Sequence, residues 1–329
     1  MRAYAYQCKD YSLLTPIFKK IFVTPIIKFV PWALPANIIT IISNCFFYIA
    51  LYLSFDQQIL GKLNFIIIPI LLSAYLIGDH LDGAQAKRTG TGSALGEFCD
   101  HYLDAFNNGF LMLIIFNLFL ITNIWLVAGV VFLSYIAHVA VFYEQFKTGW
   151  LIFEKLGSLE GVILGSLLIV AGYFTPIYNL YQMEAIAGFT MMEVILVLIC
   201  IGSVLTFFTT LKRTPNVRYS IYMYLVIMIL IGALGVFIFN SYQLVFIMTL
   251  YSSAYLGKIM VGHLVDGIER SPGLFTPLFL IIIFTMPTMY QGNTFYVLMV
   301  YLSLSIILLV YRTFQNLGQF WVWTNPSEK

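Results

Sequence analysis

The sequence predicts an all-α fold, a polytopic membrane bundle of about ten transmembrane helices with an N-terminal interfacial amphipathic helix. Composition is the first observation behind this prediction. Of the residues, 60% are hydrophobic and only 10% are charged, whereas about 25% are charged in soluble proteins. The mean hydropathy of +0.90 agrees. The second observation is a series of apolar runs of about 20 residues, each long enough to cross a bilayer. Together these observations exclude an ordinary soluble domain.

Residues 13–31 precede the apolar runs and differ from them in pattern. Apolar side chains recur there at helical spacing, while Lys19 and Lys20 fall on the opposite side. This pattern predicts an interfacial amphipathic helix that lies along one leaflet of the membrane. A helix that packs on the bundle without touching lipid is the alternative. The apolar positions are Leu13, Leu14, Ile17, Phe18, Ile21 and Phe22.

Ten apolar runs follow and define the expected spans. The chain shows no internal repeat, no low-complexity tract and no appended soluble domain, so residues 1–329 are expected to form a single integral-membrane domain. The runs fall near residues 35–55, 63–82, 96–118, 123–145, 159–175, 187–211, 217–239, 243–265, 274–291 and 294–316.

The distribution of basic residues predicts how these spans are oriented. Ten spans place both termini on the same side, and sixteen of the 17 Lys and Arg residues then share that side, with only Lys62 opposite. Basic residues are enriched in cytoplasmic loops. Both termini and the acidic residues within 79–104 are therefore expected to face the cytoplasm. The host membrane would be that of the endoplasmic reticulum or Golgi in a eukaryote, or the inner membrane in a bacterium.

Four aspartates stand out in residues 79–104 of a chain with only 15 acidic residues. Asp79 and Asp82 are three residues apart at the end of one run, and Asp100 and Asp104 are four apart near the start of the next, so each pair shares a helix face. Charged groups at membrane depth are rare and usually functional. The four carboxylates are predicted to hold two metal ions that clamp a phosphate group. Mg²⁺ fits these hard ligands best, with Mn²⁺ as an alternative.

Residues within and beside this cluster carry further predictions. Gly83 and Gly96 lack side chains where helix ends approach each other or where a ligand contacts the backbone. Lys87 and Arg88 supply positive charge for a diphosphate. Under the alternative interpretation, the acids only pair with these two bases and close a loop.

The spacing of the cluster resembles the signature of the CDP-alcohol phosphotransferase family. The family has arginine where this chain has Lys87, and these two side chains are not equivalent. The stretch 95–101, with His101 after the third aspartate, is similar to the choline/ethanolamine phosphotransferase branch, as are residues 35–40. The matching frame is Asp79-x2-Asp82-Gly83-x2-Ala86-Lys87-x8-Gly96-x3-Asp100-x3-Asp104.

The resemblance implies Mg²⁺-dependent transfer of a phospho-alcohol from CDP-choline or CDP-ethanolamine to diacylglycerol or a similar lipid, with release of CMP. It implies that Asp79, Asp82 and Asp100 hold the metals and that Asp104 completes the site. His101, oriented by Glu160, is favoured as the base, with Asp104 as the alternative base. A homodimer is implied, and no nucleic-acid partner. The implied CDP-alcohol-binding residues are Asn37, Gly83, Ala86, Lys87, Arg88 and Gly96.

Two other functions remain open on the sequence. The first exchanges the roles of the substrates, so that CDP-diacylglycerol reacts with a polar alcohol such as inositol or glycerol phosphate. The family members that do so are typically shorter, with about six spans. The second is a cation transporter, for which the carboxylates would lie near the membrane midplane on broken helices. Their predicted place at the ends of the spans argues against transport.

Overall fold

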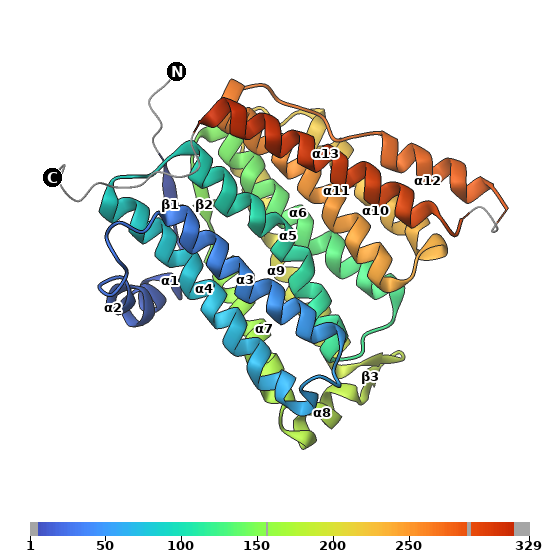
Figure 1. The fold of residues 1–329 in the computed structure, drawn as a ribbon. Helices are drawn as coiled ribbons and strands as arrows, with labels where there is room; N and C mark the ends of the chain where they lie inside the picture. Colours follow the sequence, from blue (N-terminus) through green and yellow to red (C-terminus); the bar gives the residue numbers. More distant parts are fainter. Residues whose placement is uncertain (1–5, 156, 288–290, 319–329) are drawn as a thin grey trace.

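The computed structural model describes residues 6–155, 157–287 and 291–318, and over these ranges the chain folds into one bundle of long helices (Figure 1). Two short two-stranded sheets are the only β structure in the same ranges. The all-α prediction is therefore confirmed. The helices of the bundle are α3 (Ala36–Phe55), α4 (Asn64–Thr89), α5 (Ala94–Leu118), α6 (Ile124–Thr148), α7 (Ser158–Gly172), α8 (Thr175–Gln182), α9 (Met191–Arg213), α10 (Tyr219–Ile238), α11 (Ser241–Val261), α12 (Phe275–Thr285) and α13 (Thr294–Leu317).

Each of the ten predicted runs contains a helix, but not every helix is a full span. In the described part of the chain, seven helices are long and apolar enough to cross a membrane, and α7 with α8, bent by 111°, makes an eighth candidate. Helix α12 has only 11 residues. Helix α5 is long enough, but its first half carries the acidic residues of the cluster. The number ten is thus approximate, and the polytopic architecture holds.

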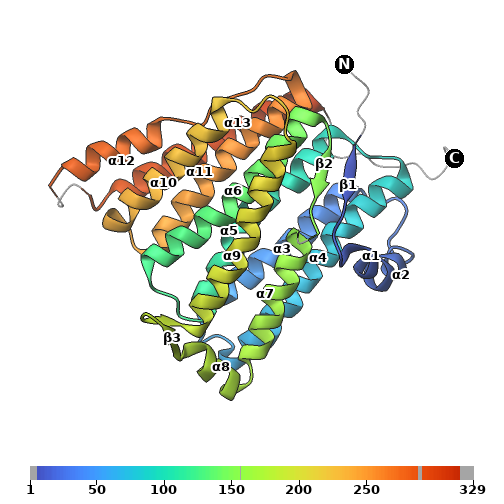
Figure 2. The same cartoon turned by 180° about the vertical axis from the view of Figure 1, so that it is seen from behind.

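Helix α5 lies in the middle of the bundle, where it packs against α3, α6 and α11 (Figures 1 and 2). Most of its residues are buried, including Glu97, His101 and Asn107. A helix with carboxylates in its first turns is stable in this position only if those groups find partners or a metal ion. The surrounding helices therefore determine which partners the acidic side chains of α5 find.

A tight turn connects α4 to α5, and we call this side of the bundle the motif end. Helix α4 ends at Gly90, whose φ of +70° is left-handed, and Ser93 begins α5 by accepting a hydrogen bond from the Gly96 amide at 3.0 Å. The predicted span stopped at residue 82, whereas the helix continues to Thr89. Residues 84–88 are good helix formers, which explains the extension. Asp79 and Asp82 consequently lie inside α4 and not at its end.

The N-terminal segment lies against the motif end. Strand β1 (Cys8–Asp10) pairs in parallel with β2 (Leu151–Phe153), which follows α6 (Figure 2). Helix α1 (Thr15–Phe18), a π-helical turn (Lys19–Val23) and α2 (Thr24–Ile26) then follow without a break. The helical segment is shorter than the predicted 13–31. Beyond its end, Pro31 has no N–H to donate to the Ile27 carbonyl, and the carbonyls of Ile27 and Val30 accept hydrogen bonds from Arg88.

Both faces of this segment bear on the prediction of an interfacial helix. Phe18 is buried, with its ring 5.2 Å from that of His80 on α4. The other face is apolar and exposed, which is the surface that an interfacial helix presents to lipid. Its placement on a membrane stays a prediction. The exposed apolar residues are Leu13, Ile17, Ile21 and Phe22.

Glu269, in the loop before α12, joins three elements at the motif end. Its carboxylate accepts hydrogen bonds from Lys147 of α6, from Ser220 of α10 and, at 3.0 Å, from Tyr143. Partial burial acts to raise the pKa of Glu269, but the hydrogen bonds, that from Lys147 foremost, outweigh it and hold the pKa below its usual value. At the opposite end, Lys62 donates to Thr175 of α8 at 2.8 Å.

Candidate metal centre

Three of the four aspartates come together between α4 and α5. One carboxylate oxygen each from Asp79, Asp100 and Asp104 lies within 4.8 Å of the other two, and all three residues are half-buried. The spacing within α5 explains the convergence, because residues four apart lie on the same side of a helix. Asp79 reaches the same point from α4 because the turn after Thr89 reverses the chain direction and α3 packs against both α4 and α5 (Figure 1).

The environment of these carboxylates fits a divalent cation. The Asp100 Oδ1 atom is buried and has no hydrogen-bond partner among the described residues, and an orphaned buried oxygen is rare unless a metal or water completes it. Asp104 is fixed in place, since the Tyr75 hydroxyl donates to its Oδ1 at 2.6 Å. No Lys or Arg among the described residues pairs with these three carboxylates, and the basic side chains beside them are His80, 3.5 Å from Asp79, and His101, 3.9 Å from Asp100. Three carboxylates are a donor set that Mg²⁺ or Mn²⁺ takes.

Asp82 occupies a different position from the other three aspartates. It is buried, and its Oδ2 accepts a hydrogen bond from the Thr40 hydroxyl of α3. It does not belong to the converging group found among the described residues. Three carboxylates thus form a group that could hold one cation, and both ions of the predicted pair, with Asp82 as a ligand, stay predictions.

His101 and Glu160, predicted as a base and its orienting acid, have different neighbours. His101 is buried, with its Nδ1 3.9 Å from Asp100 Oδ2 and its ring 5.5 Å from that of Phe142. The Glu160 carboxylate accepts hydrogen bonds from Ser12 Oγ at 2.5 Å, from the Leu14 amide and from the Gly157 amide. In the described ranges no hydrogen bond joins His101 to Glu160. The dyad stays a prediction, and the observed contacts of Glu160 anchor the N-terminal segment to α7.

A second polar cluster, which the sequence did not predict, lies one turn before His101 on α5. Glu97 Oε1 accepts a hydrogen bond from Gln145 Nε2 of α6 at 2.6 Å and lies 4.0 Å from His263 Nε2 after α11. Glu97 and Gln145 are both buried. The only sequence signal for Glu97 was its place four residues before His101, on the same helix face.

The predicted CDP-alcohol-binding residues are distributed around the α4–α5 turn. A Cβ on Gly96 would lie 3.2 Å from Asn37 Oδ1, so the absence of a side chain lets α3 approach the start of α5. Gly83 is exposed and a Cβ there would meet nothing within 4 Å, so packing within the described structure does not require a glycine at this position. Ala86 is half-buried and Lys87 is exposed. The structure thus leaves Lys87 accessible at the motif end.

Arg88 differs from Lys87 because its guanidinium hydrogen-bonds to other parts of the protein. Its guanidinium donates to the carbonyls of Ile27 and Val30 and to Gln85 Oε1. The side-chain amide of Gln85 in turn donates to three carbonyls of residues 31–34. Arg88 and Gln85 therefore hold the segment that leads into α3. The positive charge of Arg88 lies at the motif end and is used in these hydrogen bonds.

Two partners of the aspartates were missed by the sequence analysis. Thr40 binds Asp82 from another helix, and nothing in the local pattern indicates that contact. Tyr75 binds Asp104, and it lies four residues before Asp79 on the same face of α4. That spacing was a usable signal, but with 22 tyrosines in the chain it did not stand out.

The comparisons with known proteins agree with this geometry. The sequence profile of CDP-alcohol phosphatidyltransferases matches residues 33–208, which contain the whole cluster. An uncharacterized CDP-alcohol phosphatidyltransferase class-I family protein of Schizosaccharomyces pombe is 29% identical over 173 residues, 49% of this chain and 44% of that protein. Cholinephosphotransferase 1 of Saccharomyces cerevisiae is 28% identical over 188 residues, 54% of this chain and 47% of that protein.

One further match is shorter but closer in sequence. CDP-diacylglycerol–serine O-phosphatidyltransferase of Encephalitozoon cuniculi is 41% identical over 59 residues, 17% of this chain and 15% of that protein. The first two relatives are thus matched over about half of their own length.

Proposed function

The chain belongs to the CDP-alcohol phosphatidyltransferase family, and we propose that it transfers phosphocholine or phosphoethanolamine from the CDP-alcohol to diacylglycerol or a similar lipid hydroxyl. In this reaction the lipid oxygen forms a bond to the phosphorus that carries the alcohol, the bond from that phosphorus to CMP breaks, and CMP leaves. The likeness to a cholinephosphotransferase and the run of helices beyond the matched region support this choice of donor.

The single observation that carries the proposal is the convergence of Asp79, Asp100 and Asp104 within 4.8 Å. Bound there, Mg²⁺ would offset the charge of the diphosphate and stabilise the CMP leaving group. Asp82 is the residue that a second ion would need. The exposed Lys87 is placed to attract the diphosphate, and the open backbone at Gly83 lets a ligand approach.

Removal of the acceptor proton is assigned to His101. Histidine is the side chain that most often serves as a general base, whereas the Asp104 carboxylate lies in the converging group and accepts a hydrogen bond from Tyr75. His101 lies against Asp100, so a proton that it accepts would be close to the bound phosphate. We further propose that Glu160 acts on His101 indirectly, because it anchors the N-terminal segment at Ser12 and Leu14.

The proposed setting is the cytoplasmic face of a membrane, with the protein as a homodimer. The basic residues gathered at one face and the apolar helices support that orientation. A water-soluble CDP-alcohol would reach the motif end from the cytoplasm, while the lipid would arrive from within the bilayer. Transport of a cation receives no support, because α4 and α5 run unbroken past the carboxylates.

The likeness to a serine phosphatidyltransferase favours a second candidate, in which CDP-diacylglycerol is the donor and a polar alcohol the acceptor. Purified protein with Mg²⁺ distinguishes the two. CMP release from CDP-choline or CDP-ethanolamine that requires diacylglycerol supports the first, and release from CDP-diacylglycerol that requires serine, inositol or glycerol phosphate supports the second. No CMP from any combination would refute both.

A further inference from the structure

A chain of buried hydrogen bonds joins α5, α3 and α4 beside the metal centre. On α5, Asn107 Nδ2 donates to Asn44 Oδ1 of α3 at 2.8 Å. Asn44 Nδ2 donates to the carbonyl of Thr40, one turn earlier on α3, at 2.9 Å. The Thr40 hydroxyl in turn donates to Asp82 Oδ2 of α4. We call these three hydrogen bonds the α5–α3–α4 network, and all four of its residues are buried.

The backbone of α3 fixes the direction of the two amide hydrogen bonds. A carbonyl oxygen can only accept a hydrogen bond, so the amide nitrogen of Asn44 must face Thr40 and its Oδ1 must face α5. Asn107 can meet that oxygen only with its own amide nitrogen. Each side-chain amide therefore has a single orientation that satisfies both hydrogen bonds.

Both ends of the network lie at the acidic cluster. Asp104 follows Asp100 by four residues and Asn107 follows Asp104 by three, so these three side chains share one side of α5. At the other end is Asp82, which lies outside the converging group found among the described residues. The network therefore connects the outlying aspartate to the helix that carries two members of the group.

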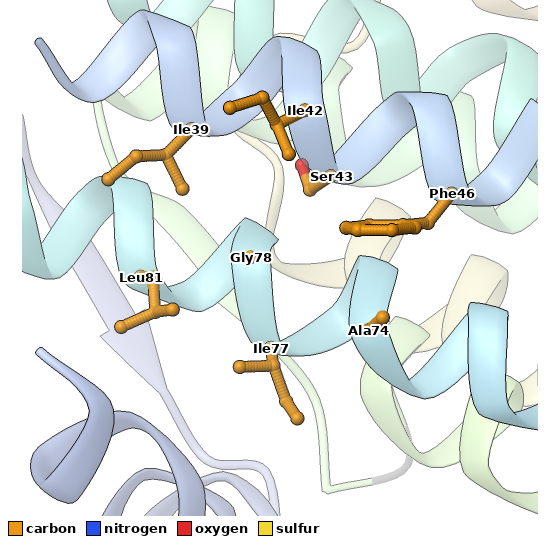
Figure 3. A pocket seen from close by; sticks show the side chains of 8 residues that line it. All are labelled: Ile39, Ile42, Ser43, Phe46, Ala74, Ile77, Gly78 and Leu81. Carbon is orange, nitrogen blue, oxygen red and sulfur yellow. The ribbon is translucent and has the colours of Figure 1, made fainter. Parts of the chain in front are cut away.

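Close packing holds the α3–α4 side of the network. Gly78 of α4 lies opposite Ser43 of α3, where the two helices line an apolar pocket (Figure 3), and a Cβ on Gly78 would lie 2.4 Å from Ser43 Cβ. Gly78 precedes Asp82 by one turn, and Ser43 follows Thr40 by about one turn, so the backbones keep Thr40 and Asp82 in register. The position of Asp82 relative to α5 then depends on how α3 is fixed against α5, and the amide pair of Asn44 lies at that contact.

We propose that Asn44 and Asn107 are positioning residues of the metal centre, and that their amide pair sets the distance between Asp82 and the three converging carboxylates. The proposal rests on the proposed function, in which a second ion uses Asp82. The two ions of such a site lie about 3.5–4 Å apart, so a small shift of α3 against α5 weakens their binding. Side chains that hold metal ligands in place without touching the ion typically change metal affinity about 10–100-fold when they are replaced.

The same two helices carry a matched pair at their opposite ends. Asn117 Nδ2 of α5 donates to Ser54 Oγ of α3 at 3.0 Å, and both residues are buried. In Asn117, as in Asn107, the Oδ1 atom has no hydrogen-bond partner within the described structure. Asn117 lies about 20 Å beyond Asp104 along α5, at 1.5 Å per residue. Asn107→Leu and Asn117→Leu therefore remove similar amides from one helix pair, near to the carboxylates and far from them.

Binding of Mn²⁺ to the purified protein tests the proposal, measured by electron paramagnetic resonance as the loss of the free-ion signal, with no CDP-alcohol present. For Asn107→Leu we expect the Kd for Mn²⁺ to rise about tenfold or more, whereas Asn117→Leu should keep the parent value. Both variants should lower the unfolding midpoint, because each leaves a buried partner unpaired. Asn44→Leu combined with Asn107→Leu removes both amides, so this double variant should recover the midpoint without recovering the affinity for Mn²⁺. The double variant also carries the test if Asn107→Leu does not fold.

Equal changes of Kd in Asn107→Leu and Asn117→Leu, or no change in either, would overturn the proposal. A double variant that binds Mn²⁺ as tightly as the parent would overturn it as well. CMP release is measured separately with the donors and acceptors given above. A parent protein that binds Mn²⁺ but releases no CMP refutes the proposed transfer, and the comparison of Kd values then decides the positioning role alone. A parent protein that binds no Mn²⁺ refutes the positioning role together with the metal centre.

Discussion

Replacing Gly78 by alanine is predicted to force α3 and α4 apart. The new Cβ would lie 2.4 Å from Ser43 Cβ and 3.3 Å from Ser43 Cα, whereas carbon atoms in ordinary contact are about 3.5–4.0 Å apart. The helices must therefore separate by roughly 1 Å, and overpacking of this kind costs about 1–3 kcal/mol. The Thr40–Asp82 hydrogen bond crosses the same two helices, so we expect transfer activity to fall with stability.

Gly83→Ala on the same helix is the control for stability. A Cβ there meets nothing within 4 Å, so the variant is expected to gain the roughly 0.5–1 kcal/mol by which alanine exceeds glycine in a helix. The two substitutions should thus shift unfolding in opposite directions.

Thermal unfolding of the purified protein in detergent measures both effects. Gly78→Ala should lower the midpoint and Gly83→Ala should leave it unchanged or raise it. Adding Ser43→Gly to Gly78→Ala removes the clash and should restore the midpoint, whereas Ser43→Ala keeps the clashing Cβ and should not. A Gly78→Ala protein that unfolds with the parent would refute the close approach of α3 and α4.

The remaining predictions concern single acidic or basic groups. Glu269→Gln removes the partner of Lys147 and should lower the unfolding midpoint at neutral pH. Because the folded-state pKa of Glu269 is lowered, its contribution is complete above the ordinary glutamate pKa of about 4.3 and is lost as the pH falls through the lower folded value. If the unfolding midpoints of the parent and Glu269→Gln still differed far below that pH, the stabilising role of the Glu269 carboxylate would be contradicted. Glu160→Gln should expose the N-terminal segment to proteolysis, and unchanged cleavage would argue against the anchoring role. His101→Ala should abolish transfer with the metal site intact; near-normal rates, together with an inactive Asp104→Asn, would make Asp104 the base.

The sequence predicts the convergence of the carboxylates well because it depends mostly on local geometry. Asp100 and Asp104 are one turn apart, and the short connection from Thr89 to Ala94 keeps the end of α4 near the start of α5. Three of the four predicted carboxylates therefore converge as expected. Asp82 differs because its partner, Thr40, comes from α3, and contacts between helices are not encoded in the spacing along one helix.

The predictions that depended on long-range contacts were the least complete. The end of α4 was placed at residue 82 because hydropathy falls there, although the helix continues to Thr89 through polar residues with good helix propensity. The contacts of Glu160 with Ser12 and Leu14 join positions 148 and 146 residues apart. Likewise, the Glu97–Gln145 hydrogen bond joins α5 to α6 across 48 residues. Hydrophobic periodicity carries no information about such pairs.

The most direct test of the central claim is the dependence of CMP release on Mg²⁺, measured for the parent protein and for Asp100→Asn with diacylglycerol and CDP-choline or CDP-ethanolamine. Asp100 supplies one of the three converging carboxylates, and its Oδ1 has no protein partner in the described structure. We predict saturable activation by Mg²⁺ for the parent, complete loss of activity with a chelator, and no activation of Asp100→Asn at any Mg²⁺ concentration. Equal activation of both proteins would contradict the assignment of the cluster as the metal centre.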